Sequence, residues 1–265
     1  MIQLSSGSME LLRARGFSLE FENTTEPSVR GITVASLEDS LHRRLTLRDL
    51  EEPKRLPLAV DFLTPQIFHR LRCGLGQSQP LPRALGLRLR ETQLAVFDAT
   101  AGLGIDAFFM AAHGCRVRSV ERSEIVYALL ADGLFRLKMA ARAPQADPHL
   151  LRISENLTFE HAQAKDLLES LPAADWPDAV YLDPMFPEET RSESALPKKG
   201  MQVFRRLLGD DTDASEVFEI ALLRARDRVV VKRPLKAANL GGRATHVFEG
   251  KTARYDMYKV TKLAL

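Results

Sequence analysis

The stretch from Leu94 to Glu121 constrains the fold more than any other part of the chain. It contains an apolar run that ends in Asp98, a turn with two glycines, an apolar segment of helical composition at 106–112, and a second apolar run at 115–120. Where a parallel strand turns into a helix, glycines let the backbone bend sharply and approach a ligand without an intervening Cβ. The stretch therefore predicts a βαβ unit with a nucleoside-type ligand at its turn.

Two acidic residues narrow the choice of ligand. Glu121 ends the second strand, 121 − 102 = 19 positions beyond Gly102, where an acidic residue commonly accepts the hydroxyl groups of a ribose. Gly102-x-Gly104-x-x-Ala107 also fits the dinucleotide pattern, so NAD, FAD and S-adenosylmethionine (SAM) all remain open. No Gly-Lys-Ser/Thr follows, which excludes a P-loop. Asp98 would repel a pyrophosphate and suits an amino group and a sulfonium, so it favours SAM.

Composition excludes several other classes of protein. The 265 residues are 45% hydrophobic and 27% charged, contain no apolar run long enough to span a bilayer, and begin without the apolar core of a signal peptide. The two cysteines have neither a disulfide framework nor zinc-ligand spacing, and Cys115 is expected in the core. We therefore expect a cytoplasmic protein with no membrane segment and no metal; the oligomeric state is left open.

Strands and helices alternate through most of the chain. Strands are predicted at 94–97, 115–120, 157–161, 178–182 and 228–231, helices at 106–112, 125–140, 201–208 and 215–226, and a hairpin at 246–248 and 254–261. This order predicts an α/β, Rossmann-like, doubly wound and mostly parallel seven-stranded sheet with a terminal antiparallel hairpin, so that one antiparallel strand lies near its edge.

The first third of the chain does not follow this alternation. Short strands are expected at 17–21 and 32–35, and a charged segment with helical or hairpin potential at 41–56. We expect residues 1–90 to form a small α+β appendage that caps the substrate or RNA side, and residues 91–265 to form the Rossmann-like domain.

Ligands of open parallel sheets bind outside the carboxyl ends of the strands, where the strand order reverses. The predicted strands end at four polar residues, Asp98, Glu121, Gln163 and Asp183. Asp98 and the turn amides would face the amino-acid half of the cofactor, Glu121 its ribose, and Gln163 its adenine.

The motif Asp183-Pro184-Met185-Phe186 suits methylation of an exocyclic amine. The lone pair of such a nitrogen is delocalised into the ring, so the protein helps by accepting its hydrogens at Asp183 or at a rigidly held carbonyl. Phe186 would stack on the base, which contributes about 1–3 kcal/mol. A base inside a helix cannot reach such a site, so the target must be unpaired or flipped out.

Basic residues near these strand ends are candidates for phosphate contacts. The net charge of +2 does not by itself indicate nucleic acid. Lys198 and Lys199 follow the acidic motif, and Lys232 and Arg233 at the next strand end are expected to face the same side. Losing such contacts should weaken RNA binding and flatten its salt dependence.

The segments DATAGLGIDAF, CRVRSVER, VYLDPMFP, SALPKKGMQVF and RVVVKRP, in this order, resemble the ribosomal RNA small subunit methyltransferase J family. The resemblance runs from about residue 59 to 260 and implies a SAM-dependent enzyme that methylates guanine N2 of 16S rRNA, with 16S rRNA or the small ribosomal subunit as partner. Together, the turn and the resemblance place the cofactor contacts at Asp98, Ala101, Gly102, Gly104, Ile105, Asp106, Glu121, Arg122, Gln163, Ala164 and Asp183.

Two positions depart from the family pattern. Ile105 stands where the family usually has arginine, and Gln163-Ala164 where small hydroxyl residues are common, so a backbone contact survives there but a side-chain contact at Ile105 does not. Three alternatives remain at this stage: methylation of adenine N6 or a protein amide, a dinucleotide oxidoreductase, and a non-catalytic ribosome-assembly factor.

Overall fold

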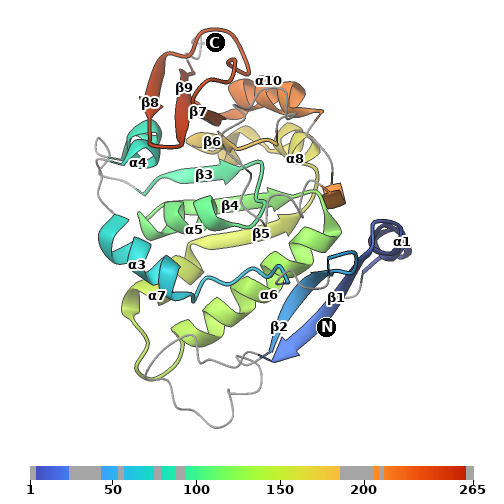
Figure 1. The fold of residues 1–265 in the computed structure, drawn as a ribbon. Coiled ribbons are helices and arrows are strands. Elements are labelled where there is room, and N and C mark those ends of the chain that lie inside the picture. The colour runs from blue at the N-terminus through green and yellow to red at the C-terminus, as the bar shows by residue number, and fades with distance from the viewer. Residues whose placement is uncertain are drawn as a thin grey trace.

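The computed structural model describes residues 4–23, 43–52, 57–74, 79–87, 93–185, 206–208 and 212–260. Within these residues, seven strands form one central sheet in the order β5-β4-β3-β6-β7-β9-β8 (Figure 1). The strands are β3 (Ala95–Asp98), β4 (Arg116–Glu121), β5 (Leu157–His161), β6 (Ala179–Leu182), β7 (Arg228–Pro234), β8 (His246–Glu249) and β9 (Ala253–Lys259).

The strand order reverses at β3. β3 pairs in parallel with β4 on one side and with β6 on the other. The chain first adds β4 and β5 on one side of β3 and then crosses over to place β6 on the other side. β9 is antiparallel to both of its neighbours, β7 and β8, and lies second from the edge. The predicted doubly wound sheet with one antiparallel strand near its edge is therefore confirmed, and its ligand crevice is expected beside β3.

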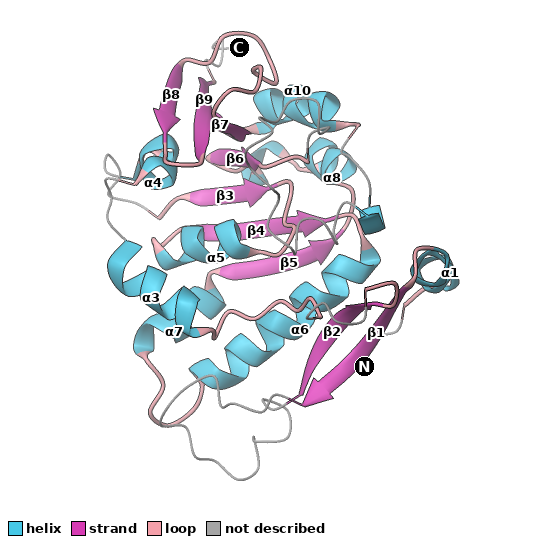
Figure 2. Cartoon of the chain, viewed as in Figure 1, coloured by secondary structure: helices cyan, strands magenta, loops and turns pink. Residues whose placement is uncertain are grey.

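Helices cover both faces of the sheet (Figure 2). One face carries α3 (Pro65–Gly74), α4 (Pro80–Leu85), α5 (Ile105–Ala112), α6 (Glu124–Ala141) and α7 (Pro148–Glu155), and the other carries α8 (Ala164–Ser170) and α10 (Ala214–Arg224). A short 3-10 turn spans Ala173–Asp175. Residues of β7 alternate between the two layers: Val230 packs with the first, Val229 and Val231 with the second.

Local sequence signals explain several helix starts. Ser123 caps α6, with its side chain accepting from the Val126 N–H. α7 lies in a segment for which no helix was predicted. It begins where Asp147 caps the first turn and Pro148 occupies the first helical position, which is a favourable helix start. α8 was also missed, because its seven residues are too few to show a period.

The N-terminal segment forms a helix and a hairpin. α1 (Ser6–Ala14) precedes β1 (Phe17–Asn23), which pairs with β2 (Arg43–Asp49) in a separate antiparallel sheet next to α6 (Figure 1). The strand predicted at 17–21 is confirmed. The segment 41–56, for which a helix or a hairpin was left open, contributes one described strand, β2, which pairs with β1. The strand predicted at 32–35 lies outside the described residues, as does most of the helix predicted at 201–208.

Buried ion pairs fasten the N-terminal segment to α6. The Leu45 N–H donates to the Asp132 carboxylate at 3.1 Å. Arg136, 2% exposed, pairs with Asp132 and Asp61 and donates to the Val60 carbonyl. A guanidinium this deeply buried is tolerated because two carboxylates and a carbonyl satisfy it.

Residues 57–74 and 79–87 pack directly on the central sheet. The fully buried ring of Phe62 stacks between Phe108 of α5, with centroids 5.1 Å apart, and Phe159 of β5, at 6.1 Å. α4 contacts β7, β8 and β9 at the far side of the sheet. Cys115 is also fully buried, which confirms it as a core residue. No helix among the described residues is both long and apolar enough to cross a membrane.

Phe62→Ala should lower the free energy of unfolding by about 3–5 kcal/mol, because it removes a buried ring stacked on two others and leaves a cavity between α5 and β5. Denaturant titration followed by circular dichroism measures the change. Phe135→Ala is the matched control, since Phe135 is 51% exposed and its loss should cost little. Equal stabilities of the two variants would contradict a core role for Phe62.

Candidate active site

The turn after β3 is shaped by its two glycines. Both have left-handed backbone angles, with φ of 53° at Gly102 and 71° at Gly104. A Cβ at Gly104 would come within 2.7 Å of the Phe159 ring, whereas at Gly102 it would meet only the Thr100 carbonyl oxygen at 3.9 Å. Gly104 is thus required for packing under the turn, and Gly102 keeps the outer side of the turn open. α5 begins at Ile105, directly after Gly104, so its first N–H groups, which have no partner within the helix, lie at this turn.

Asp98 is buried at the end of β3. Its carboxylate accepts from the Ser119 hydroxyl at 2.7 Å and the Thr100 N–H at 3.0 Å. Burial raises the pKa of Asp98 to about 7, and the nearby charges of Asp106 and Asp183 act in the same direction, while the two hydrogen bonds oppose them. A cation placed beside this carboxylate would stabilise its charged form.

Glu121 fixes the same turn from β4. One carboxylate oxygen accepts from the Gly102 N–H at 3.1 Å and the other from the Ser123 N–H at 2.8 Å. Each carboxylate oxygen has more than one acceptor direction, so both bonds are compatible with accepting ribose hydroxyl groups. Glu121 therefore holds the glycine turn to the start of α6, at the place predicted for the ribose.

The turn after β6 lies against the turn after β3. The Asp183 N–H donates to the Thr100 hydroxyl at 2.6 Å, and the Ala99 N–H donates to the Tyr181 carbonyl at 2.9 Å. The acidic motif and the glycine turn are therefore on the same edge of the sheet, as the sequence predicted. Pro184 is buried and Met185 packs against the core, which anchors the beginning of the motif.

Lys232 connects two of the predicted site residues. Its Nζ lies 2.7 Å from the Asp106 carboxylate and 2.8 Å from the Asp183 carboxylate. Asp106 also accepts from the Tyr181 hydroxyl at 2.7 Å. Burial would raise the pKa of Asp106, but the charge and hydrogen bond of Lys232, with help from Tyr181, outweigh it and lower the pKa below its ordinary value. The sequence did not indicate this role of Tyr181, because a tyrosine inside an apolar strand is typical of a core residue.

The remaining predicted cofactor residues border this crevice in different ways. Ile105, the first residue of α5, packs its side chain on the core, so only its backbone can meet a ligand. The Ala162 N–H donates to the Glu121 carbonyl at 3.1 Å, which brings the end of β5 beside the end of β4. Gln163 is exposed and Ala164 begins α8.

Arg122 is directed toward α10. Its guanidinium pairs with Asp213 at 2.9 Å, and its carbonyl oxygen lies 3.1 Å from Nε2 of His161. These contacts fix the backbone that follows Glu121. The predicted contact of Arg122 with the cofactor stays a prediction, as do those of Ala101, Gln163 and Ala164.

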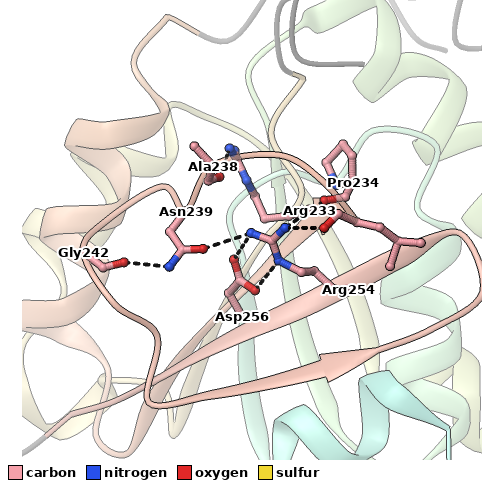
Figure 3. Close-up of polar contacts among 8 residues, drawn as sticks. Arg233, Pro234, Ala238, Asn239, Gly242, Arg254 and Asp256 are labelled. Carbon is pink, nitrogen blue, oxygen red and sulfur yellow. Dashed lines mark hydrogen bonds and ion pairs between the residues drawn. The ribbon is translucent and has the colours of Figure 1, made fainter. Parts of the chain in front are cut away.

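Of the two basic residues at the end of β7, Lys232 faces the acidic motif as expected, but Arg233 does not. Successive residues of a strand point to opposite faces, so Lys232 turns toward Asp106 and Arg233 toward the other layer. Arg233 is only 4% exposed and donates to the Ala238 carbonyl in the loop after β7 (Figure 3). Phe186, Lys198 and Lys199 lie outside the described residues, so their expected roles stay predictions.

Arg254 anchors the loop that Arg233 supports (Figure 3). It forms a two-point ion pair with the fully buried Asp256, donates to the Pro234 and Leu235 carbonyls at 3.2 and 2.7 Å, and donates to the Asn239 side chain at 2.9 Å. Paired in this way, Arg254 holds the end of β7 and its following loop on β9, and this fixes the strand that carries Lys232.

The donor set fits a cationic nucleoside cofactor. Asp98, Asp106 and Asp183 gather at one crevice with Lys232 as the cation bound to two of them, and Glu121 adds a fourth carboxylate at the glycine turn. The excess of negative charge suits the sulfonium and ammonium of SAM and opposes a pyrophosphate. Fold and site thus define the class of SAM-dependent methyltransferases.

Two comparisons agree with this class. Residues 28–260 match the family described as "Putative SAM-dependent methyltransferase". The crystal structure of a SAM-dependent methyltransferase from Neisseria gonorrhoeae superposes with a TM-score of 0.62 over 98% of this chain and 94% of that one, at 24% sequence identity. The superposition shows the shared fold, and the family match gives SAM as the cofactor.

Relatives of higher identity give the particular family. A ribosomal RNA small subunit methyltransferase J from Saccharophagus degradans is 44% identical over 226 residues, which cover 84% of this chain and 82% of the relative. One from Thioalkalivibrio sulfidiphilus is 46% identical over 203 residues, 76% of each chain. The chain belongs to the ribosomal RNA small subunit methyltransferase J family.

Glu121→Gln should raise the Kd for SAM about tenfold or more. An amide accepts at only one of its two atoms, so either the Gly102 or the Ser123 N–H loses its acceptor and the glycine turn loosens. Isothermal titration calorimetry measures the change. Glu124→Gln is the control, because Glu124 binds Ser5 instead of the turn. Unchanged SAM affinity in Glu121→Gln would contradict its role.

Asp98 should make SAM binding dependent on pH. Its pKa in the folded protein, about 7, lies above the ordinary value of 3.8. The stability that this group contributes without ligand is therefore full below pH 3.8 and lost as pH rises through about 7. A cationic ligand favours the charged carboxylate, so SAM should bind more tightly as pH rises through about 7 and release a proton below it.

Calorimetry in buffers of different ionisation enthalpy measures that proton release. Asp98→Asn cannot titrate, so its weaker binding should lose the pH dependence, and its unliganded stability should fall less between about pH 5 and about pH 8. A wild-type affinity that stays constant over this range would show that Asp98 is not the group facing the ligand cation.

Proposed function

We propose that this chain transfers a methyl group from SAM to the exocyclic N2 of a guanine in the RNA of the small ribosomal subunit. The single observation that carries the proposal is the hydrogen bond from the Asp183 N–H to the Thr100 hydroxyl, because it seats the amine-accepting motif against the cofactor turn. The names of the relatives support small-subunit ribosomal RNA as the substrate, and the family resemblance supports guanine N2.

The chemistry required of the protein is positioning and proton handling. When bound, SAM supplies an electrophilic methyl carbon and leaves as S-adenosylhomocysteine. The amine nitrogen forms the new bond to carbon and must lose one of its two protons. Asp183, whose side chain is 40% exposed at the crevice, would accept a hydrogen bond from the amine and receive the proton that the amine loses. By holding the amine in place, this acceptor would help to align its nitrogen with the methyl carbon.

Phe186 would hold the base against this acceptor by stacking, since it follows Asp183 by three positions in the motif. The guanine must leave its helix or be unpaired to reach Asp183. Lys198 and Lys199, which follow the motif in sequence, would bind the neighbouring phosphates.

The N-terminal segment is proposed to contribute to the RNA-facing side. α1 is fixed next to the cofactor edge, because Ser5 binds the carboxylate of Glu124 at the start of α6 through both its N–H and its hydroxyl. Arg206 pairs with Asp49 at the end of β2. The division into residues 1–90 and 91–265 remains part of this proposal. Within the first part, residues 57–74 and 79–87 pack on the central sheet.

The test is transfer of labelled methyl from SAM to small ribosomal subunits and to their naked RNA, followed by nucleoside analysis. Wild-type protein should yield N2-methylguanosine. Asp183→Ala should lower the rate at least about a hundredfold, because it removes the acceptor, while the Kd for SAM changes less. Asp175→Ala replaces an exposed acid ahead of β6 and should leave the rate unchanged.

Other outcomes would redirect or refute the proposal. Methylated adenosine as the product would move the activity to adenine N6. Tight SAM binding without transfer to any RNA would favour an assembly factor. Normal turnover in Asp183→Ala would remove its carboxylate from the mechanism.

A further inference from the structure

We propose that Lys232 is a positioning residue for methyl transfer, whose ammonium holds the Asp106 and Asp183 carboxylates together and aims Asp183 at the target amine. This inference rests on the proposed function and deepens it. It gives Lys232 a role other than the phosphate contact that its sequence position suggested.

The strand register places Lys232 for this role. Leu182 and Val231 are register partners on β6 and β7, so the next residue of each strand, Asp183 and Lys232, also lie side by side. The ammonium reaches both carboxylates, at 2.7 Å for Asp106 and 2.8 Å for Asp183. Two short charge-assisted bonds to acids from different elements define the position of the nitrogen.

The network extends from the core to the crevice. Tyr181, 1% exposed, donates its hydroxyl to Asp106 at 2.7 Å, so the far end of the network is fixed by the sheet. Exposure then rises from the side chain of Asp106, at 15%, to Lys232, at 26%, and Asp183, at 40%. The rigid end is buried and the accepting end is open, which is the arrangement expected for a side chain held for catalysis by its neighbours.

The charges explain why a cation is needed here. Without it, Asp98, Asp106 and Asp183 would gather as like charges in a partly buried site, and they would repel one another. Burial alone would lower the pKa of Lys232, but the charges of Asp183 and Asp106 outweigh it and raise the pKa above its ordinary value. Lys232 therefore keeps its charge at any pH at which the enzyme works.

The same contacts argue against a phosphate role for Lys232. Its ammonium is turned into the crevice and bound by two carboxylates, and a phosphate would have to approach these acids. The repulsion would cancel most of the attraction to a single lysine.

The experiment compares Lys232→Met, which removes the charge, with Lys232→Arg, which keeps it. Lys236→Met, at an exposed lysine four residues on, is the matched control. Single-turnover rates at saturating small-subunit RNA, KM for RNA and its salt dependence, and the pH profile are measured for each. Thermal unfolding checks the fold, and Lys232→Gln replaces the methionine variant if that variant does not fold.

We expect Lys232→Met to lower the single-turnover rate about a hundredfold, the size of effect that a displaced catalytic group produces, with KM for RNA nearly unchanged. The acidic limb of its pH profile should move to higher pH, because Asp106 then lacks the cation that lowers its pKa. Lys232→Arg should recover part of the rate and keep the limb in place. Lys236→Met should behave like the wild type.

Other titratable groups near Lys232 also influence the pH profile of the rate. The pKa of Tyr255 is raised to about 12 by burial and by the charge of Asp106, so Tyr255 stays neutral through the working range. Among the described residues, the charged or titratable groups that face Lys232 or its partners are Asp98 of β3, Asp106 of α5, Tyr181 and Asp183 of β6 and its turn, Tyr255 of β9 and Arg70 of α3.

Three results would overturn the inference. A raised KM for RNA with a flatter salt dependence and an unchanged saturated rate would make Lys232 a phosphate contact. A rate loss equal at all pH values and equal in the Met and Arg variants would make it a general structural residue. If wild-type protein and Lys236→Met transfer no methyl to RNA, the proposed function fails, and this inference fails with it.

Discussion

The parallel pairing of β3 with both β4 and β6 is the constraint on which the rest of the molecule depends. Because the strand order reverses at β3, the turns that follow β3, β4 and β6 open on the same edge of the sheet. The hydrogen bond between Asp183 and Thr100 joins two of these turns, and the bond between Glu121 and Gly102 joins the third. The cofactor crevice is therefore a consequence of strand order, and each of its walls is a strand end.

The site concentrates negative charge and controls it locally. Burial, together with the charges of Asp106 and Asp183, raises the pKa of Asp98 to about 7, whereas Asp106 shares Lys232 with Asp183 and has a lowered pKa. Two carboxylates on neighbouring elements thus differ because only one of them has a lysine. Because their pKa values differ, Asp98 is suited to a ligand cation, whereas Asp106 is linked through Lys232 to Asp183, the acceptor of the target amine.

The stability of the crevice comes from layers behind it. Phe62 stacks on Phe108 and Phe159, and Gly104 at the turn also packs against Phe159. The segment that carries Phe62 therefore supports the glycine turn through the Phe159 ring. On the opposite side, Arg254 fixes the loop after β7 and so the strand that carries Lys232. Packing and site geometry are coupled at both ends of the sheet.

The sequence by itself determined the elements and the ligand turn. Apolar runs ending in Asp98, Glu121 and Asp183 predicted the strands and their polar tips, since alternation, glycine conformation and helix caps are properties of a few neighbouring residues. Those signals were sufficient for the sheet class and for the convergence of these three acids. They were too weak for α7, whose only signal was its N-terminal cap, and for α8, which is too short to show a helical period.

Only the tertiary structure decided which distant residues meet. The register of β6 on β7 places Lys232 beside Asp183, and the start of α5 brings Asp106 to the same ammonium, across 232 − 106 = 126 positions of chain. The opposite directions of Lys232 and Arg233 follow from strand alternation and were readable in advance. The sequence could not predict which of the two faces the crevice, because β7 is apolar on both faces and nothing in its sequence distinguishes one face from the other.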